Sequence, residues 1–319
     1  MALLKYQIST FLYPKMNLLF HFAKNKNMNT GIKTRDYYPG DEWVFFKLYG
    51  GITICDKILF THVLPLTKFL ESEDTIDKWF FIRYSDPEFH LRIRLHTNDK
   101  NKFGEITQCF NSVISPLCKN HILNYYCIDT YRREIGRYGA DGISLSEDIF
   151  CLESKLMLPF FNDLHSAQLS NKRWKAAFPF IDNFLNIMNF DLSQKIEIIG
   201  RLNEGFLKEF GFGEHNKKKL NSQFRKYRNT IEQVMGKSQQ DDTLGLAVST
   251  YIKAINREFP TLMRKKGNTT LNISAHLHMM MNRLFYSSNR NYELLIYNFL
   301  YRYYKSVIFT KNRQPITHS

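Results

Sequence analysis

The sequence WFFIRYSDPEFHLRIRLH, at residues 79–96, decides the predicted fold. Two runs rich in aromatic and aliphatic residues lie on either side of a short turn at Ser85-Asp86-Pro87. A short turn joins antiparallel strands, because parallel strands need a long crossover connection. We therefore predict two paired strands over 79–84 and 89–96.

Side chains in the second of these strands alternate between two faces of a sheet. One face is apolar and is expected to be buried. The other face carries four positive or titratable side chains, which are His90, Arg92, Arg94 and His96. A guanidinium group can hold a carboxylate or phosphate through two parallel hydrogen bonds. The pattern favours a surface that binds an anion, and the alternative is a basic sheet face exposed to solvent.

Further strands and helices are predicted around this pair. A strand at 42–49 ends at Gly50-Gly51, and an extended run follows at 123–134. The four strands 43–49, 79–84, 89–96 and 123–134 are expected to form one mostly antiparallel sheet. Helical spacing occupies 52–70, with a break near Pro65, and 102–121. Large aromatic residues in these strands are expected in the core, namely Trp43, Trp79, Tyr84 and Phe89.

The half after Gly142 is predicted to be helical. Ser144 and Glu147 have the spacing of a capping box, which places a helix N-cap at Ser144. Gly211, Gly213, Gly236 and Pro260 are expected to separate helices. The predicted helices run from 144 to about 160 and over 173–189, 192–210, 214–235, 243–258, 271–286 and 292–308. The fold class is α+β, with a mostly antiparallel sheet in the first half and a helical second half.

The composition limits the class of protein. The chain has 319 residues and a formal net charge of +14, which favours attraction to anions. We find no zinc-finger, RNP or phosphate-loop motif, so direct specific nucleic-acid binding is not expected. The five cysteines include no C-x-x-C pair, which favours reduced thiols in the cytoplasm. Charged residues and Pro14 interrupt the apolar stretches of residues 1–27, so no membrane span is predicted.

Three segments together resemble one known family. They are the FIRY–HLRIRL pair, YRREIGRYG at 131–139 and HMMMNRLF at 278–285. In this order they are similar to motifs of the C-terminal domain of class I lantibiotic dehydratases, which also has free-standing members in thiopeptide pathways. The resemblance covers about 43–308 and implies one elimination-type domain at 41–312, preceded by a poorly defined extension at 1–40. Ala140 departs from the pattern, since the family often has a second glycine there.

The resemblance implies a single site built from the three segments. The candidate catalytic residues are Arg92, Arg94, Glu134, Arg137 and His278, and the candidate substrate-binding residues are His90 and Arg133. Neighbouring residues of a strand point to opposite faces, so only one of Arg132 and Arg133 can join the site. His276 is expected to face elsewhere than His278. Two structural alternatives stay open: Arg137 as an ion-pair partner of Glu134, and His278 as a core histidine.

The resemblance also implies a reaction. A partner first transfers glutamate from glutamyl-tRNA to a Ser or Thr hydroxyl of a ribosomally made precursor peptide. The present domain then removes the α-proton and expels glutamate, which leaves dehydroalanine or dehydrobutyrine. Arginines would hold the departing carboxylates, and a histidine would move the proton near neutral pH. No metal or organic cofactor is expected.

The expected partners follow from this reaction. The glutamylating domain of the family is not found in this sequence, so we expect a separate glutamyl-tRNA-dependent transferase as well as the precursor peptide. A lanthionine cyclase is a further candidate partner. Two other functions remain open: a pyridine-forming cyclase of thiopeptide pathways, and a non-catalytic module that presents the precursor peptide. A neighbouring transferase gene would favour elimination, and neighbouring azoline-forming enzymes would favour the cyclase.

Overall fold

The computed structural model describes residues 34–163, 169–236, 243–264, 267 and 269–311. All of these residues belong to one compact unit, Thr34–Ser319. Most of the extension predicted at 1–40, namely residues 1–33, lies outside the described residues.

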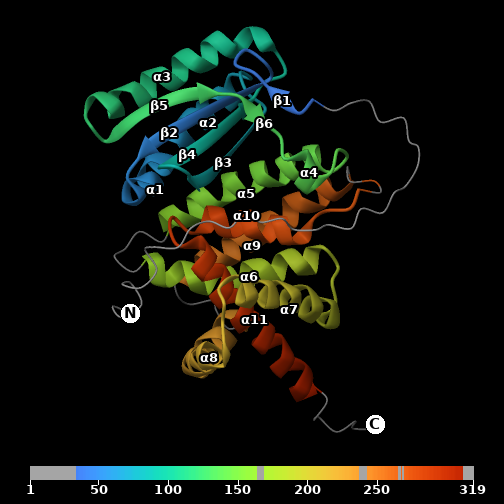
Figure 1. Ribbon diagram of the computed structural model, residues 1–319. Helices are drawn as coiled ribbons and strands as arrows, with labels where there is room; N and C mark the ends of the chain where they lie inside the picture. Colours follow the sequence, from blue (N-terminus) through green and yellow to red (C-terminus); the bar gives the residue numbers. More distant parts are fainter. Residues whose placement is uncertain (1–33, 164–168, 237–242, 265–266, 268, 312–319) are drawn as a thin grey trace. The chain divides into compact units, whose positions relative to one another are not determined.

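Four strands form an antiparallel sheet in the order β3-β4-β2-β5 (Figure 1). They are β2 (Trp43–Gly50), β3 (Lys78–Ser85), β4 (Phe89–His96) and β5 (Leu123–Asp129). A second sheet pairs β1 (Asp36–Tyr37) with β6 (Tyr131–Arg132). The single strand expected at 123–134 is therefore wrong beyond Asp129. The chain leaves the large sheet there because Tyr131 and Arg132 pair with β1, and the short helix α4 (Ile135–Tyr138) begins directly afterwards.

Most of the remaining described residues are helical, which confirms the α+β class. In the first half they are η2 (Ile52–Ile54), α1 (Cys55–Ile58), the π-helical turn η3 (Leu59–Val63), α2 (Leu64–Ser72), η4 (Lys100–Lys102) and α3 (Phe103–Lys119). The second half contains α5 (Ile143–Asp163), α6 (Leu169–Ile187), α7 (Leu192–Glu209), α8 (Glu214–Met235), α9 (Thr243–Arg264), α10 (Ile273–Leu284) and α11 (Asn289–Lys311). The break expected near Pro65 is wrong, because the chain stays helical from Cys55 to Ser72. The π-helical turn η3 directly precedes α2, and the Leu64 N–H donates to the Leu59 carbonyl oxygen.

Two of the predicted helix signals are wrong. Helix α5 begins at Ile143, so Ser144 lies inside it and is not the N-cap. The α4–α5 turn depends on Gly142, since a Cβ there would lie 2.2 Å from the Tyr138 carbonyl oxygen. Pro260 does not end a helix, because α9 continues through it to Arg264. The apolar face of α9 also continues, with Phe259 buried and Leu262 packed against the core beyond the proline.

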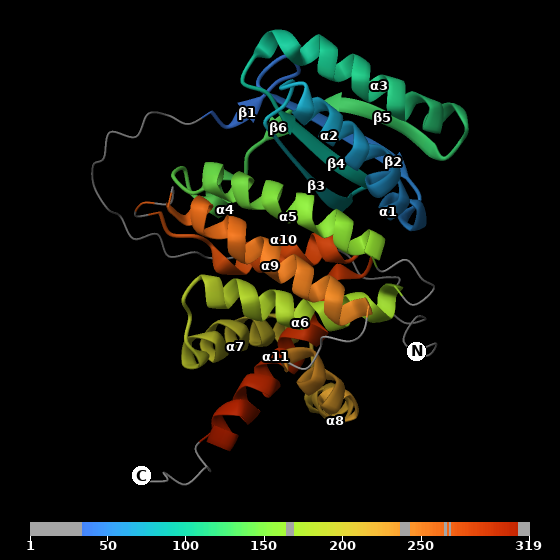
Figure 2. The same cartoon turned by 180° about the vertical axis from the view of Figure 1, so that it is seen from behind.

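The two faces of the sheet have different coverings. Figures 1 and 2 show α3 on one side of the sheet and α5 on the other. On the first side, Phe46 of β2 stacks on Phe110 of α3, with 3.6 Å between ring centroids. On the second side, Trp43, Phe45 and Phe80 form a cluster with residues of α4, α5 and α10. This second face also carries His90, Arg92, Arg94 and His96 of β4.

The outer edge of β3 is closed by side chains from the helical half. The Phe81 N–H donates to Ser154 Oγ of α5 at 3.2 Å. Asn282 of α10 bonds both backbone groups of Arg83, accepting from its N–H at 2.9 Å and donating to its carbonyl oxygen at 2.8 Å. These bonds satisfy strand groups that would otherwise have no partner, and they fix α5 and α10 beside the sheet.

Candidate active site

The strand register arranges the second face of the sheet in rows that cross all four strands. The first row is Tyr84, His90, Tyr49 and Tyr125, the second is Ile82, Arg92, Lys47 and Cys127, and the third is Phe80, Arg94, Phe45 and Asp129. Arg92 and Arg94 thus occupy neighbouring rows of one face, as the alternation in HLRIRL requires.

Arg94 is a buried cation, 6% exposed, enclosed by aromatic rings. Its guanidinium carbon lies 4.5 Å from the Phe45 centroid, 4.6 Å from Tyr131 and 5.1 Å from Phe80. Its Nε and Nη1 have no hydrogen-bond partner in the described part of the chain. Burial lowers the pKa of Arg94 to about 10, and the charge of Arg92 adds to this effect, but the group remains charged at neutral pH. Arg94 is therefore a buried cation with no ion-pair partner among the described residues.

Arg92 is oriented by His90 and Tyr84. Its Nε–H donates to His90 Nε2 at 2.9 Å, and its guanidinium lies 3.4 Å from the centroid of the Tyr84 ring. Since Nε2 accepts, the proton of the neutral imidazole is on Nδ1, which donates to the Glu88 carbonyl oxygen at 2.8 Å. Burial lowers the pKa of His90, which favours this neutral form. Both ring nitrogens of His90 are used within the protein, so its place in the site is beside Arg92, as a support.

The two adjacent arginines of YRREIGRYG point in different directions. The Arg133 guanidinium is buried and forms two bonds to Glu147 of α5, at 2.7 and 2.6 Å. The Tyr131 hydroxyl donates to the same carboxylate at 2.8 Å. Arg132 is exposed and pairs with Asp36 of β1. Glu147, predicted to cap a helix, instead binds Arg133 and so attaches this segment to α5.

We expect Arg133 to matter for stability far more than Arg132 does. Replacing Arg133 by alanine leaves the buried Glu147 carboxylate without its cation, which should lower the free energy of unfolding by about 3–5 kcal/mol. Arg132→Ala removes an exposed pair and should change little. Urea titration followed by circular dichroism measures both variants, and equal losses would contradict the structural role of the Arg133–Glu147 pair.

Glu134 and Arg137 form an exposed ion pair at the other end of the segment. Arg137 Nη1 lies 3.0 Å from Glu134 Oε2, and both side chains are about half exposed. The negative charge of Glu134 also acts on Arg94, because it raises the pKa of that arginine and so partly offsets the effect of burial. The Arg137 carbonyl oxygen accepts from Asn272 Nδ2 at 3.1 Å. This segment therefore lies between Arg94 of the sheet and the start of α10.

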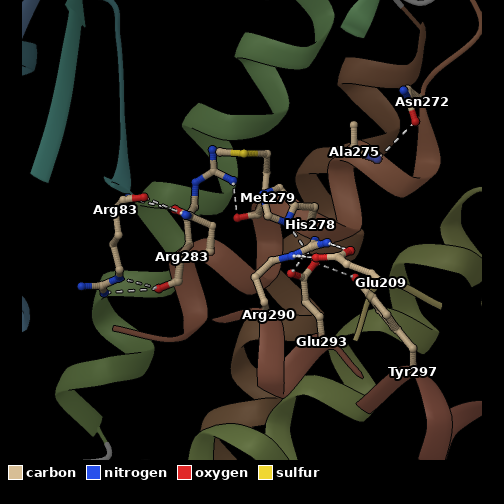
Figure 3. A network of polar contacts seen from close by, with 11 residues as sticks. Arg83, Glu209, Asn272, Ala275, His278, Met279, Arg283, Arg290, Glu293 and Tyr297 are labelled. Atoms are coloured by element: carbon tan, nitrogen blue, oxygen red, sulfur yellow. Dashed lines mark hydrogen bonds and ion pairs between the residues drawn. The ribbon is translucent and has the colours of Figure 1, made fainter. Parts of the chain in front are cut away.

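His278 is held by a buried carboxylate that the sequence analysis missed. Its Nδ1 lies 2.9 Å from Glu293 Oε1, and Figure 3 shows that carboxylate between His278, Arg290 and Tyr297. Glu293 is 1% exposed and also accepts from the Tyr297 hydroxyl and Arg290 Nη1, each at 3.3 Å. A carboxylate at this distance favours a proton on Nδ1, and in that tautomer of the neutral ring Nε2 has the lone pair. The available signal was Glu293 itself, an acidic residue followed by the apolar run LLIY of α11.

Helix α10 brings His278 towards the same apolar cluster that surrounds Arg94. The Asn272 side chain accepts from the Ala275 N–H at 3.2 Å and caps the helix. Ala275 and Met279 pack with Phe45 and Phe80, the rings beside Arg94. His278 directly precedes Met279. His278 lies three positions after Ala275, so it is on the same side of α10 as the residues of this cluster.

His276 faces another direction, as expected, and lies fully buried between Tyr138, Phe150 and Phe184. Burial, with the nearby Arg283 charge, lowers its pKa from 6.5 to about 3.

The pKa of His276 is lower in the folded protein than in the unfolded chain, so protonation favours unfolding. The neutral ring is tolerated above pH 6.5, and the free energy of unfolding falls as the pH is lowered from 6.5 to 3. His276→Met should therefore lose less stability over that range than the parent, by up to about 5 kcal/mol. Thermal melts at several pH values test this, and parallel losses would contradict it.

The residues that the structure describes lack two features. They contain no group of three or more His, Cys, Asp or Glu side chains placed to hold a metal ion. None of their helices has the length and apolar character that crossing a membrane requires.

The fold and the order of the three motif segments agree with one protein family. The family profile described as "Lantibiotic biosynthesis dehydratase C-term" matches residues 43–304. The chain belongs to this family of lanthipeptide and thiopeptide biosynthesis. Among curated proteins it is similar to the nisin biosynthesis protein NisB of Lactococcus lactis subsp. lactis, with 26% identity over 293 residues. It is also similar to the subtilin biosynthesis protein SpaB of Bacillus subtilis, with 30% identity over 122 residues.

The matches differ in how much of each relative they cover. The aligned region is 91% of this chain but 28% of NisB, and 37% of this chain but 12% of SpaB. The chain thus spans about a quarter of the length of NisB. Activities and partners of the whole relatives do not pass to this chain by the match alone.

Solved structures share the fold. The tRNA-dependent lantibiotic dehydratase MibB from Microbispora sp. 107891 superposes with a TM-score of 0.61 at 18% identity, covering 91% of this chain and 29% of MibB. TsrL gives 0.58 at 11% identity, covering 84% of this chain and 95% of TsrL. TbtD, the pyridine synthase from thiomuracin biosynthesis, gives 0.56 at 10% identity, covering 85% and 100%. The fold occurs in a dehydratase and in a pyridine synthase, so the choice between functions depends on the site residues.

Proposed function

We propose that residues 41–312 form an elimination domain, which releases glutamate from glutamylated Ser or Thr residues of a precursor peptide. The observation that carries this proposal is Arg94, a buried guanidinium whose Nε and Nη1 are unbonded and which has no carboxylate partner among the described residues. A protein bears the cost of such a group where an anion is bound during function. Glutamate provides that anion.

The proposed reaction needs one base and one anion-binding region. His278 Nε2 removes the proton from the α-carbon of the modified residue. The C–H electron pair forms the Cα=Cβ double bond, the Cβ–O bond breaks, and glutamate departs as a carboxylate that retains this oxygen. Arg94 and Arg92 stabilise the negative charge that develops on the leaving group. The reaction is not a redox step and needs no further reactant.

Glu293 has a supporting part in this proposal. Its carboxylate holds the Nδ1–H of His278, so the ring presents Nε2 in the form that accepts a proton. When His278 becomes charged, the buried carboxylate stabilises the imidazolium. Arg137 forms an exposed ion pair with Glu134. In this proposal Arg137 releases Glu134 and adds positive charge for the departing carboxylate.

A pyridine-forming cyclase is the competing enzyme. The cycloaddition of two dehydroalanines releases no carboxylate. Arg92 and Arg94 would therefore have no anionic group to bind in that reaction. A module that only presents the peptide would need neither an unpaired buried cation nor a histidine oriented by a buried carboxylate. The ionisable groups therefore favour elimination over both alternatives.

The partners follow from the substrate. The precursor peptide is the substrate, and a glutamyl-tRNA-dependent transferase supplies its glutamyl ester, which places the reaction in the cytoplasm. A lanthionine cyclase would consume the dehydroamino acids that elimination produces.

Coexpression tests the proposal. The precursor peptide is produced with the transferase, with and without this protein, and analysed by mass spectrometry. We expect glutamyl adducts from the transferase alone and dehydrated residues when this protein is present. The same adducts in both samples would contradict elimination, and a new macrocycle formed only from dehydrated, azoline-containing peptide would favour the cyclase.

A further inference from the structure

A continuous band of rings crosses the whole sheet beside the arginine rows. It is the first row, Tyr84–His90–Tyr49–Tyr125, with one residue from each strand of the large sheet. Tyr49 stacks on Tyr125 with centroids 4.3 Å apart and lies 4.6 Å from His90. Tyr84 lies 5.5 Å from His90 on the opposite side. Sheet register alone explains why residues so far apart in sequence form one band.

The band is accessible at both ends. Tyr84 is 39% exposed and Tyr125 is 47% exposed, although both are large apolar rings. Tyr49 is half-buried and His90 is buried between them. The prediction that Tyr84 belongs to the core is wrong, because its ring lies under the Arg92 guanidinium at the surface. Grouped exposed aromatic rings are uncommon on a protein surface unless they contact a partner.

The chemistry of the band indicates what it contacts. His90 accepts from Arg92 through Nε2 and donates to the Glu88 carbonyl oxygen through Nδ1, which is the pattern of a neutral imidazole. The next row carries Arg92, and the row after it carries Arg94. A ligand that is anionic at one point and apolar a short distance away would complement both parts. A peptide that carries a glutamyl ester on one residue and apolar side chains nearby has this character.

We propose that Tyr49, Tyr84 and Tyr125 bind apolar or aromatic side chains that flank the reactive Ser or Thr of the precursor peptide. This inference rests on the proposed function and adds a determinant of substrate choice to the same site.

The geometry gives the spacing. His90 and Arg94 are four residues apart along β4, which corresponds to about 13 Å in an extended chain. In an extended peptide, alternate side chains face the same way. A peptide whose reactive residue lies at Arg94 would therefore bring the side chain about four positions away onto the tyrosines. The residue about two positions away would lie near Arg92.

Binding of two synthetic peptides tests the inference. Both carry a fluorescein label and one central serine. In the first, phenylalanine occupies the positions two and four residues away on both sides, and in the second those positions are glycine. We expect Tyr125→Ala to weaken binding of the first peptide by about two- to tenfold, the scale of one aromatic contact, and to leave the second unchanged. Tyr125→Phe keeps the ring and should bind as the parent does.

Tyr38→Ala is the matched control, because Tyr38 is 61% exposed and belongs to none of the sheet rows. Circular dichroism checks that each variant is folded. No loss on Tyr125→Ala, or equal loss for both peptides, would overturn the inference. The peptides are unmodified, so the assay does not depend on elimination. Selective binding of the phenylalanine peptide by a protein that releases no glutamate would reject the proposed function alone. Normal glutamate release by a protein whose peptide binding does not depend on Tyr125 would reject the tyrosine surface alone.

Discussion

Replacing His278 by alanine is expected to stop glutamate release and to leave the glutamylated peptide intact. The variant lacks the imidazole that takes the α-proton, and removal of a general base commonly lowers a rate by ~10²-fold or more. Glutamylation by the transferase should continue, so adducts should accumulate on the precursor. Mass spectrometry of the coexpressed peptide measures both steps at once.

Controls separate a catalytic histidine from a structural one. Lys217→Ala changes an exposed side chain of α8 and should leave elimination unchanged. Glu293→Gln keeps the shape at His278 Nδ1 but removes the carboxylate charge, so it should lower kcat with little change in KM. If the His278→Ala variant dehydrates its peptide as fast as the parent, the histidine is structural. Arg92→Ala and Arg137→Ala should likewise cause glutamyl adducts to build up.

Replacing Arg94 by methionine is expected to abolish elimination while making the protein more stable. The parent buries a guanidinium whose Nε and Nη1 have no hydrogen-bond partner, and an unsatisfied buried donor costs about 1–3 kcal/mol. Methionine fills similar space among Phe45, Phe80 and Tyr131 without that cost. We expect a gain of about 1–2 kcal/mol in the free energy of unfolding, since binding sites commonly trade stability for function.

The contrasting variant is Arg133→Met. Arg133 is bonded to Glu147, so its loss should destabilise the fold, whereas loss of Arg94 should not. Denaturant titration gives the free energies, and the glutamate-release assay gives the activity. A destabilised Arg94→Met protein would mean that the arginine serves packing through its ring contacts, which would remove the main support for an anion site.

Much of the sheet follows from local patterns. Period-two alternation in HLRIRL correctly separates Leu91, Ile93 and Leu95 from Arg92 and Arg94, because strand geometry assigns successive side chains to opposite faces. The helical second half also follows from apolar spacing and glycine positions. The helix stop expected at Pro260 failed because burial of Phe259 and the packing of Leu262 continue the helix past the proline.

The site is less accessible to prediction, because its contacts join distant segments. Glu293 reaches His278 across fifteen positions and two helices, and Glu147 reaches Arg133 from another helix. Nothing in the local sequence distinguishes an acidic residue that binds a histidine from one that faces solvent. The tyrosine row depends on the register of four strands, which appears only when the sheet is assembled. Family motifs selected the segments, but they did not give the partners of each side chain.

The most direct measurement uses purified protein and a synthetic peptide that bears a glutamyl ester on a single serine. No transferase or tRNA is present, so any change in the peptide comes from this protein. The account predicts free glutamate and dehydroalanine in equal amounts, with both lost in the His278→Ala variant. An ester that remains intact, or glutamate released by hydrolysis with the serine regenerated, would contradict the account.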